Sequence, residues 1–222
     1  SMFKNLPYDW ARDFTPVGPM ATFDFVLFVH KNSPLKTVKD VIAAAKAQPD
    51  KFNFGSIAVG TAQNLSTLNF VAMAGIDVPT VPFRTTGEVM TALISGSVAA
   101  AFETIPGAIA EINSGEMRAI AVSSTERNPF LPDVPTIAES GVPNYRTYSW
   151  NGMVLPAKTP PQVVARVNKE INAAVATPEI RKRFSELIMV PRTGTPADLQ
   201  KIYDEDVAIW RKIITDAKIQ PN

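Results

Sequence analysis

Residues 54–64 read Phe-Gly-Ser-Ile-Ala-Val-Gly-Thr-Ala-Gln-Asn and join two segments of different character. The segment that ends here, from about Phe52 to Ser56, is typical of a short strand. The segment that follows, from about Thr61 to Ala74, is typical of a helix, and Gly75 is suited to end it. A strand that passes through a glycine-bearing turn into a helix is the repeating unit of α/β folds. The stretch therefore predicts an α/β fold.

The same unit recurs on both sides of this turn. Upstream, an apolar strand at 23–30 precedes a helix whose start, Thr37-Val38-Lys39-Asp40, matches a capping box, and Pro49 marks its end. Downstream, strands alternate with helices: strands at 78–83, 98–103 and 118–123, and helices at 87–95 and 106–113. This repeated βαβ order predicts a doubly wound, mostly parallel sheet.

The remainder of the chain has a different pattern. Residues 124–147 are rich in proline and polar groups, which predicts a long surface connection before a strand at 148–155. From Pro160 onward the pattern is mostly helical, with apolar stripes at Val163, Val164, Val167 and Ile171 and in a helix at 197–218. Too few strands follow residue 155 to cover these stripes, so we expect the helices to use a sheet from elsewhere.

The composition excludes several classes of function. The chain has 222 residues with 22 basic and 21 acidic side chains, so no global charge attracts nucleic acid. Cysteine is absent, which excludes disulfides, thiolate metal sites and a cysteine nucleophile. The chain has one histidine, His30, expected at the surface, and no Gly-x-Ser-x-Gly motif. We therefore expect no catalytic residues, no metal and no cofactor.

The turn at 54–64 has the features of an anion site. Ligands of open α/β sheets bind at the carboxyl ends of strands, where helix N-termini offer backbone N–H groups. Gly55 and Gly60 allow close approach of the backbone, and neutral donors are added by Ser56, Thr61, Gln63 and Asn64. The lysine of a nucleotide-binding P-loop is missing, which argues against nucleotide hydrolysis. The alternative is that the glycines only shape a tight turn.

Other strand ends supply further candidates, each with a structural alternative. Thr85 and Thr86 are either pocket hydroxyls or ordinary helix-start residues, and Glu103 either accepts a hydrogen bond from a ligand or caps the next helix. Trp150 either lines a cleft between lobes or lies in the core of a strand. Arg84 is expected to be a solvated surface charge.

Several segments together resemble the Bug-type substrate-binding proteins of tripartite tricarboxylate transporters. The matching segments run through nearly the whole chain: Leu6-Pro7-Tyr8-Asp9, Asp13-Phe14-Thr15-Pro16-Val17, Asn53-Phe54-Gly55-Ser56, Val81-Pro82-Phe83, residues 131–141 (Leu-Pro-Asp-Val-Pro-Thr-Ile-Ala-Glu-Ser-Gly) and Ser149-Trp150. The resemblance implies a periplasmic-binding-protein-like fold of type II. It also implies a cleft that closes on a small carboxylate, delivery to membrane transporter subunits and a periplasmic location.

The resemblance also implies a division into lobes and a set of site residues. Residues 25–147 would form the second lobe, and residues 1–24 and 148–222 the trailing parts of an incomplete first lobe. Ala58 stands where the family favours glycine, Asn64 where histidine is common and Glu103 where aspartate is common, which bears on the identity of the ligand. The expected ligand-binding residues are Ser56, Ala58, Gly60, Thr61, Asn64, Thr85, Thr86, Glu103 and Trp150.

Two hypotheses follow. The first is a solute receptor for a small carboxylate, with no catalytic step. The second is a remnant that binds no ligand and acts as an interaction or oligomerisation module, because apolar stripes after Pro160 without a full sheet favour a homo-oligomer. The first residues, Ser1 to Asn5, lack the pattern of a secretory signal, so no signal peptide is expected in this chain.

Overall fold

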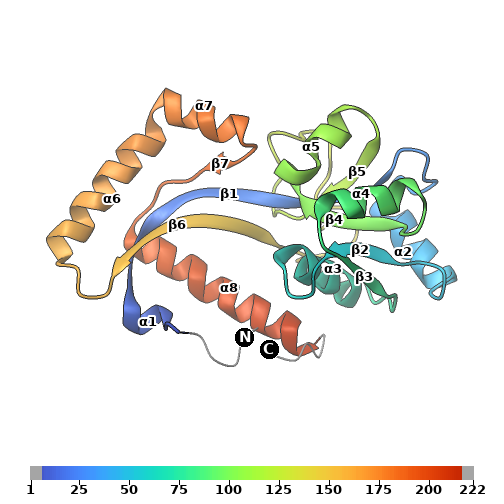
Figure 1. The fold of residues 1–222 in the computed structure, drawn as a ribbon, viewed down its shortest axis with the longest axis horizontal. Helices are drawn as coiled ribbons and strands as arrows, with labels where there is room; N and C mark the ends of the chain where they lie inside the picture. Colours follow the sequence, from blue (N-terminus) through green and yellow to red (C-terminus); the bar gives the residue numbers. More distant parts are fainter. Residues whose placement is uncertain (1–6, 217–222) are drawn as a thin grey trace. The chain divides into compact units, whose positions relative to one another are not determined.

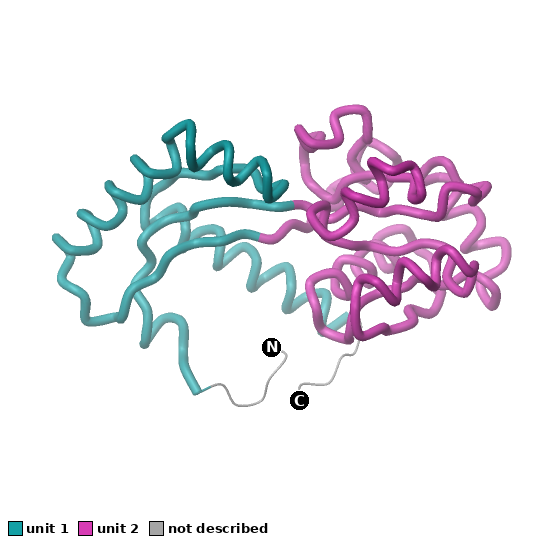
Figure 2. Tube along the Cα trace, turned by 45° about the horizontal axis from the view of Figure 1, so that its top comes forward, with its two compact units in different colours: residues 1–23, 150–222 teal, residues 24–149 magenta. Residues whose placement is uncertain are grey.

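The computed structural model describes residues 7–216. The chain divides into two compact units, shown in different colours in Figure 2. Unit 1 comprises Ser1–Phe23 and Trp150–Asn222, and unit 2 comprises Asp24–Ser149. Two strands, β1 (Phe14–His30) and β6 (Tyr148–Pro156), contain residues of both units.

Unit 2 contains the βαβ repeats that the sequence predicts. Its elements, labelled in Figure 1, are the second half of β1, α2 (Val38–Ala47), β2 (Phe54–Ile57), α3 (Ala62–Met73), β3 (Thr80–Phe83), α4 (Thr86–Ile94), β4 (Ala100–Thr104), α5 (Ile105–Asn113) and β5 (Met117–Val122). Apart from β1, the ends of these elements lie within two residues of the predicted ones. The predicted capping box is also present, since Thr37 and Asp40 cap each other at the start of α2. Local signals therefore determine these elements.

The sheet of unit 2 has the order β3-β2-β4-β1-β5. Strands β3, β2 and β4 are parallel, while β1 is antiparallel to both of its neighbours, β4 and β5. Four of the five strands therefore point the same way. Because β2, β3 and β4 are parallel, their carboxyl ends meet at one edge of the sheet, and α3, α4 and α5 all begin there.

An aromatic cluster fills the core of unit 2. Phe54, Phe70, Phe102 and Tyr145 are fully or almost fully buried, and their ring centroids lie 5.6–6.4 Å apart in the contacting pairs. The hydroxyl of Tyr145 donates to the carbonyl oxygen of Ser66 at 2.8 Å, and burial raises the pKa of this phenol. The cluster joins β2, α3 and β4 to the segment after β5.

The prediction that residues 124–147 form a surface connection is wrong. Ile137, Val142 and Tyr145 are buried members of the core. The backbone N–H of Val122 donates to Pro135 and that of Ile137 donates to Val122, both at 2.9 Å, so this segment pairs with the edge of β5 that faces away from β1. Proline and polar residues predict a loop, but here they cover a sheet edge that would otherwise leave backbone groups unpaired.

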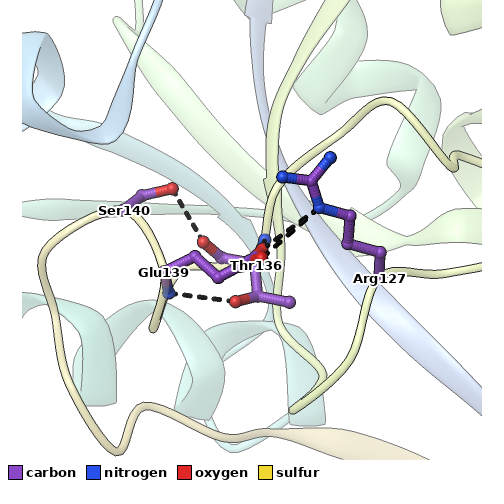
Figure 3. A network of polar contacts seen from close by, with 4 residues as sticks. All are labelled: Arg127, Thr136, Glu139 and Ser140. Atoms are coloured by element: carbon purple, nitrogen blue, oxygen red, sulfur yellow. Dashed lines mark hydrogen bonds and ion pairs between the residues drawn. The ribbon is translucent and has the colours of Figure 1, made fainter.

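A polar network holds the turn in this segment, and Figure 3 shows it from close by. The N–H of Thr136 donates to Oε2 of Glu139 at 2.7 Å, and the N–H of Glu139 donates back to Oγ1 of Thr136 at 3.0 Å. Arg127 lies 3.4 Å from the Glu139 carboxylate. The hydrogen bond from Thr136 and the charge of Arg127 lower the pKa of Glu139. The network is structural and explains the Thr-Ile-Ala-Glu pattern.

Unit 1 contains a small sheet covered by helices. The first half of β1 pairs with β6 and with β7 (Val190–Pro191), and the helices are α1 (Trp10–Asp13), α6 (Pro161–Ala176), α7 (Pro178–Glu186) and α8 (Pro196–Asp216). Part of the sheet that the C-terminal helices need is therefore supplied by β1, which begins nine residues earlier than predicted. Pro16, Gly18 and Pro19 obscure this part of the strand in the sequence, because such residues usually interrupt strands.

Side-chain contacts tie the helices of unit 1 to its strands. Asn168 of α6 donates from Nδ2 to the carbonyl oxygens of Val17 and Gly194, at 2.7 and 2.8 Å. Leu199 of α8 is fully buried against β6, where Gly152 leaves room for it. Val163 is 42% exposed, so its predicted place in the buried stripe of α6 is wrong. The predicted end of α8, at Lys218, lies outside the described residues.

Candidate functional site

Three helices of unit 2 begin at the carboxyl edge of the parallel strands, and each is capped by a threonine. Thr61 at α3, Thr85 at α4 and Thr104 at α5 accept a hydrogen bond on Oγ1 from the backbone N–H three residues ahead, at 3.2–3.3 Å. Such a cap pairs one backbone N–H group of the first helical turn. The other N–H groups of that turn have no partner within the helix and point away from the helix end. The edge thus concentrates three positive helix ends in one place (Figure 1).

The turn before α3 is held by its own hydrogen bonds. Gly60 has a φ of +86°, a left-handed conformation that favours glycine, and its N–H donates to Oδ1 of Asn64 at 3.1 Å. The N–H of Thr61 donates to the carbonyl oxygen of Ala58 at 3.1 Å. Because both N–H groups are used within the turn, an anion would meet the first-turn N–H groups of Ala62 and Gln63 instead.

The candidate residues of this turn differ in their exposure. Ala58 is exposed and Thr61 is half-buried, so both can face a ligand. Ser56 is 0% exposed and donates from Oγ to the carbonyl oxygen of Ile57, and Asn64 is 3% exposed. The last two residues lie beneath the turn and support it. In the next loop, Thr85 is exposed and Thr86 half-buried.

Glu103 lies below the three helix starts and is 2% exposed. Its Oε1 accepts from Nε2 of Gln63 at 2.8 Å and from the N–H and Oγ1 of Thr104, and its Oε2 accepts from Oγ1 of Thr86 at 2.8 Å. The structure thus places Glu103 among protein donors on α3, α4 and the start of α5.

The predicted residues come together with one exception. Eight of the nine lie in three consecutive strand-to-helix loops of unit 2 or in the strands and helices next to them: Ser56, Ala58, Gly60, Thr61, Asn64, Thr85, Thr86 and Glu103. Trp150 belongs to unit 1, where its indole N–H donates to the carboxylate of Asp206 in α8. Gln63 was predicted as a neutral donor of the turn but not as one of the nine expected ligand-binding residues, and Thr104 was not predicted. Thr104 could have been predicted from the sequence, because a threonine stands directly before α5 as it does before α3 and α4.

In the described part of the chain, no cluster of metal ligands supplements the helix starts at this edge. Arg84 is exposed at the end of β3. Among residues 7–216, no three histidine, aspartate or glutamate side chains lie together as metal ligands would. In the same range, no helix combines the length and the apolar character needed to span a bilayer.

His30 lies at the other edge of the sheet. It ends β1 and pairs with Met117 at the start of β5, whereas the three threonine caps follow the ends of their strands. A cavity of about 440 Å³ lies there, lined mainly by apolar side chains such as Leu35, Phe52 and Leu93. This cavity is separate from the candidate site.

Comparison with protein families matches residues 1–219 to the family described as the tripartite tricarboxylate transporter family receptor, TctC. The chain belongs to the TctC family. This confirms the predicted resemblance to Bug-type substrate-binding proteins. A curated relative from Pseudomonas sp. strain P51, the UPF0065 protein in the tcbD-tcbE intergenic region, is 32% identical over 99% of this chain. The chain spans 66% of the length of that relative.

Several solved structures share the fold of this chain. Rpa4515 of R. palustris, solved with adipate, has a TM-score of 0.84 and 32% identity over 100% of this chain and 74% of its own. MatC of Rhodopseudomonas palustris, solved with malate, has a TM-score of 0.77 and 27% identity over 96% of this chain and 74% of its own. The periplasmic binding protein BugD has a TM-score of 0.80 and 27% identity over 100% of this chain and 75% of its own. These neighbours confirm the predicted α/β, periplasmic-binding-protein-like fold.

Proposed function

We propose that this TctC chain captures a small carboxylate for a tripartite tricarboxylate-type transporter, without a catalytic step. The observation that carries the proposal is the group of three threonine-capped helix starts at one edge of the sheet of unit 2. Helix N-termini favour anions because their N–H groups are unpaired and carry partial positive charge. Adipate and malate, the ligands of Rpa4515 and MatC, are both small dicarboxylates.

The nine predicted residues take different roles in this proposal. Ala58, Gly60, Thr61 and Thr85 form the surface that faces the carboxylate. Ser56, Asn64, Thr86 and Glu103 hold that surface in shape, because they are buried or half-buried and bonded within the protein. Trp150 belongs to unit 1, and its role in ligand binding stays a prediction.

The two units correspond, in this proposal, to two lobes of a binding protein. Unit 2 is the second lobe, predicted at 25–147, and unit 1 belongs to the first. The protein acts in the periplasm, as BugD does, and delivers its ligand to membrane subunits of the transporter. The expected homo-oligomer stays a prediction that light scattering can test.

A thermal-shift measurement tests the proposal. Adipate is expected to raise the melting temperature of the chain, while adipamide of the same length leaves it unchanged, because only the acid presents an anion to the helix starts. At an adipate concentration of about 100 times Kd, binding stabilises the native state by about 2.7 kcal/mol. Equal shifts with acid and amide would contradict an anion site. No shift with either compound, in a chain that light scattering finds to be oligomeric, would favour the interaction module.

A further inference from the structure

Glu103 poses a question that carboxylate binding leaves unanswered. A buried carboxylate beneath a site for an anion repels the ligand, and burying its charge is costly unless hydrogen bonds compensate. Its hydrogen-bond partners are all uncharged: Gln63, Thr86 and Thr104. The protein therefore places a carboxylate that accepts hydrogen bonds from all three partners beneath the place where its ligand is negative.

The contacts of Glu103 give it a positioning role. Gln63 lies in the first turn of α3, Thr86 is the first residue of α4, and Thr104 caps α5. One carboxylate thus joins three loops that are up to 40 positions apart in sequence. Helix α5 also packs directly on it, since a Cβ at Gly107 would lie 3.0 Å from Cγ of Glu103.

The charge of Glu103 limits what the site can hold. A helix N-terminus carries about half an elementary positive charge, so three of them supply roughly one and a half. The carboxylate of Glu103 cancels about one charge of this. The remaining half charge is less than the charge of one carboxylate group, so a second carboxylate beside the first would meet uncompensated repulsion.

We propose that Glu103 is a positioning residue that also sets specificity: it holds the three loops together and restricts unit 2 to one carboxylate of the ligand. The preferred ligands then carry their carboxylates on well-separated carbons. Ligands with two carboxylates on one carbon are rejected. This inference rests on the proposed function and adds the ligand class to it.

The test uses two isomers of equal charge and mass, glutarate and ethylmalonate. Isothermal titration calorimetry on the full chain is expected to show tighter binding of glutarate.

In Glu103→Gln the amide oxygen accepts from Gln63 and Thr104 and the amide nitrogen donates to Thr86 Oγ1, so the loops stay in place without the charge. The preference for glutarate is expected to fall by about fivefold or more, as removal of a nearby charge in a protein site allows. Glu103→Ala is expected to weaken both isomers about tenfold or more, since the loops lose their common acceptor.

The matched control is Glu126→Gln, which removes the same charge from an exposed position of unit 2 and is expected to change neither affinity. An unchanged isomer preference in Glu103→Gln would overturn the role in specificity.

Hydrogen exchange tests positioning without ligand: amides of residues 60–64 and 85–88 should exchange faster in Glu103→Ala but not in Glu103→Gln. Unchanged exchange in Glu103→Ala would overturn the positioning role. If the wild-type chain binds neither isomer nor adipate, the proposed function itself fails, and the exchange data still decide the positioning role.

Discussion

Replacement of Gly60 by valine is expected to weaken adipate binding about 100-fold or more, a loss of about 2.7 kcal/mol. Gly60 has a φ of +86°, and a β-branched residue is strained in this region. Relief of the strain moves the turn, breaks the hydrogen bond from the Gly60 N–H to Asn64 and displaces the start of α3. The first-turn N–H groups then no longer point to one place. Calorimetry with adipate measures the effect.

The control for this variant is Gly115→Val. Gly115 has a φ of +75° after the end of α5, in open space, so the backbone strain is similar but falls at the opposite end of the helix from the site. Both variants are expected to lose similar stability, and only Gly60→Val should lose affinity. Circular dichroism checks that both variants are folded. If both are folded and bind adipate with equal affinity, the turn is not part of the site.

Phe70→Ala is expected to destabilise unit 2 by about 3–5 kcal/mol, the usual cost of removing a buried aromatic ring. Phe70 is 0% exposed and contacts Phe54, Phe102 and Tyr145 at centroid distances of 5.6–6.1 Å. Its loss leaves a cavity where α3 packs on the sheet. Hydrogen exchange in β2 and β4 is expected to accelerate accordingly.

Two comparisons make this result specific. Met73→Ala changes a side chain that is 41% exposed on the same helix and is expected to cost less than about 1 kcal/mol. The three tryptophans, Trp10, Trp150 and Trp210, all belong to unit 1, so their fluorescence reports on unit 1 separately. A small loss of protection in Phe70→Ala, similar to that of Met73→Ala, would show that the aromatic cluster does not hold unit 2 together.

The succession of helices and strands in unit 2 could be read from the sequence because its signals are local. The capping box at Thr37 and Asp40 involves residues three positions apart. Gly96 and Gly115 each come directly after the C-cap residue of a helix. The turn at 54–64 was identified as a candidate site for the same reason. Where signals conflict locally, as with Pro16 and Pro19 in β1, the predicted strand began too late.

The tertiary structure alone decided what lies next to what. The sequence indicated that Glu103 ends a strand, but its contacts with Gln63 and Thr86 depend on β2, β3 and β4 being neighbours in parallel. Residues 124–147 have the composition of a loop, yet Ile137 and Tyr145 enter the core because β5 leaves an edge to be covered. Caps and periodicity act within one turn of the chain, so the sequence by itself determines them. Sheet order and edge pairing join residues that are tens of positions apart, and only the packing of the whole unit determines them.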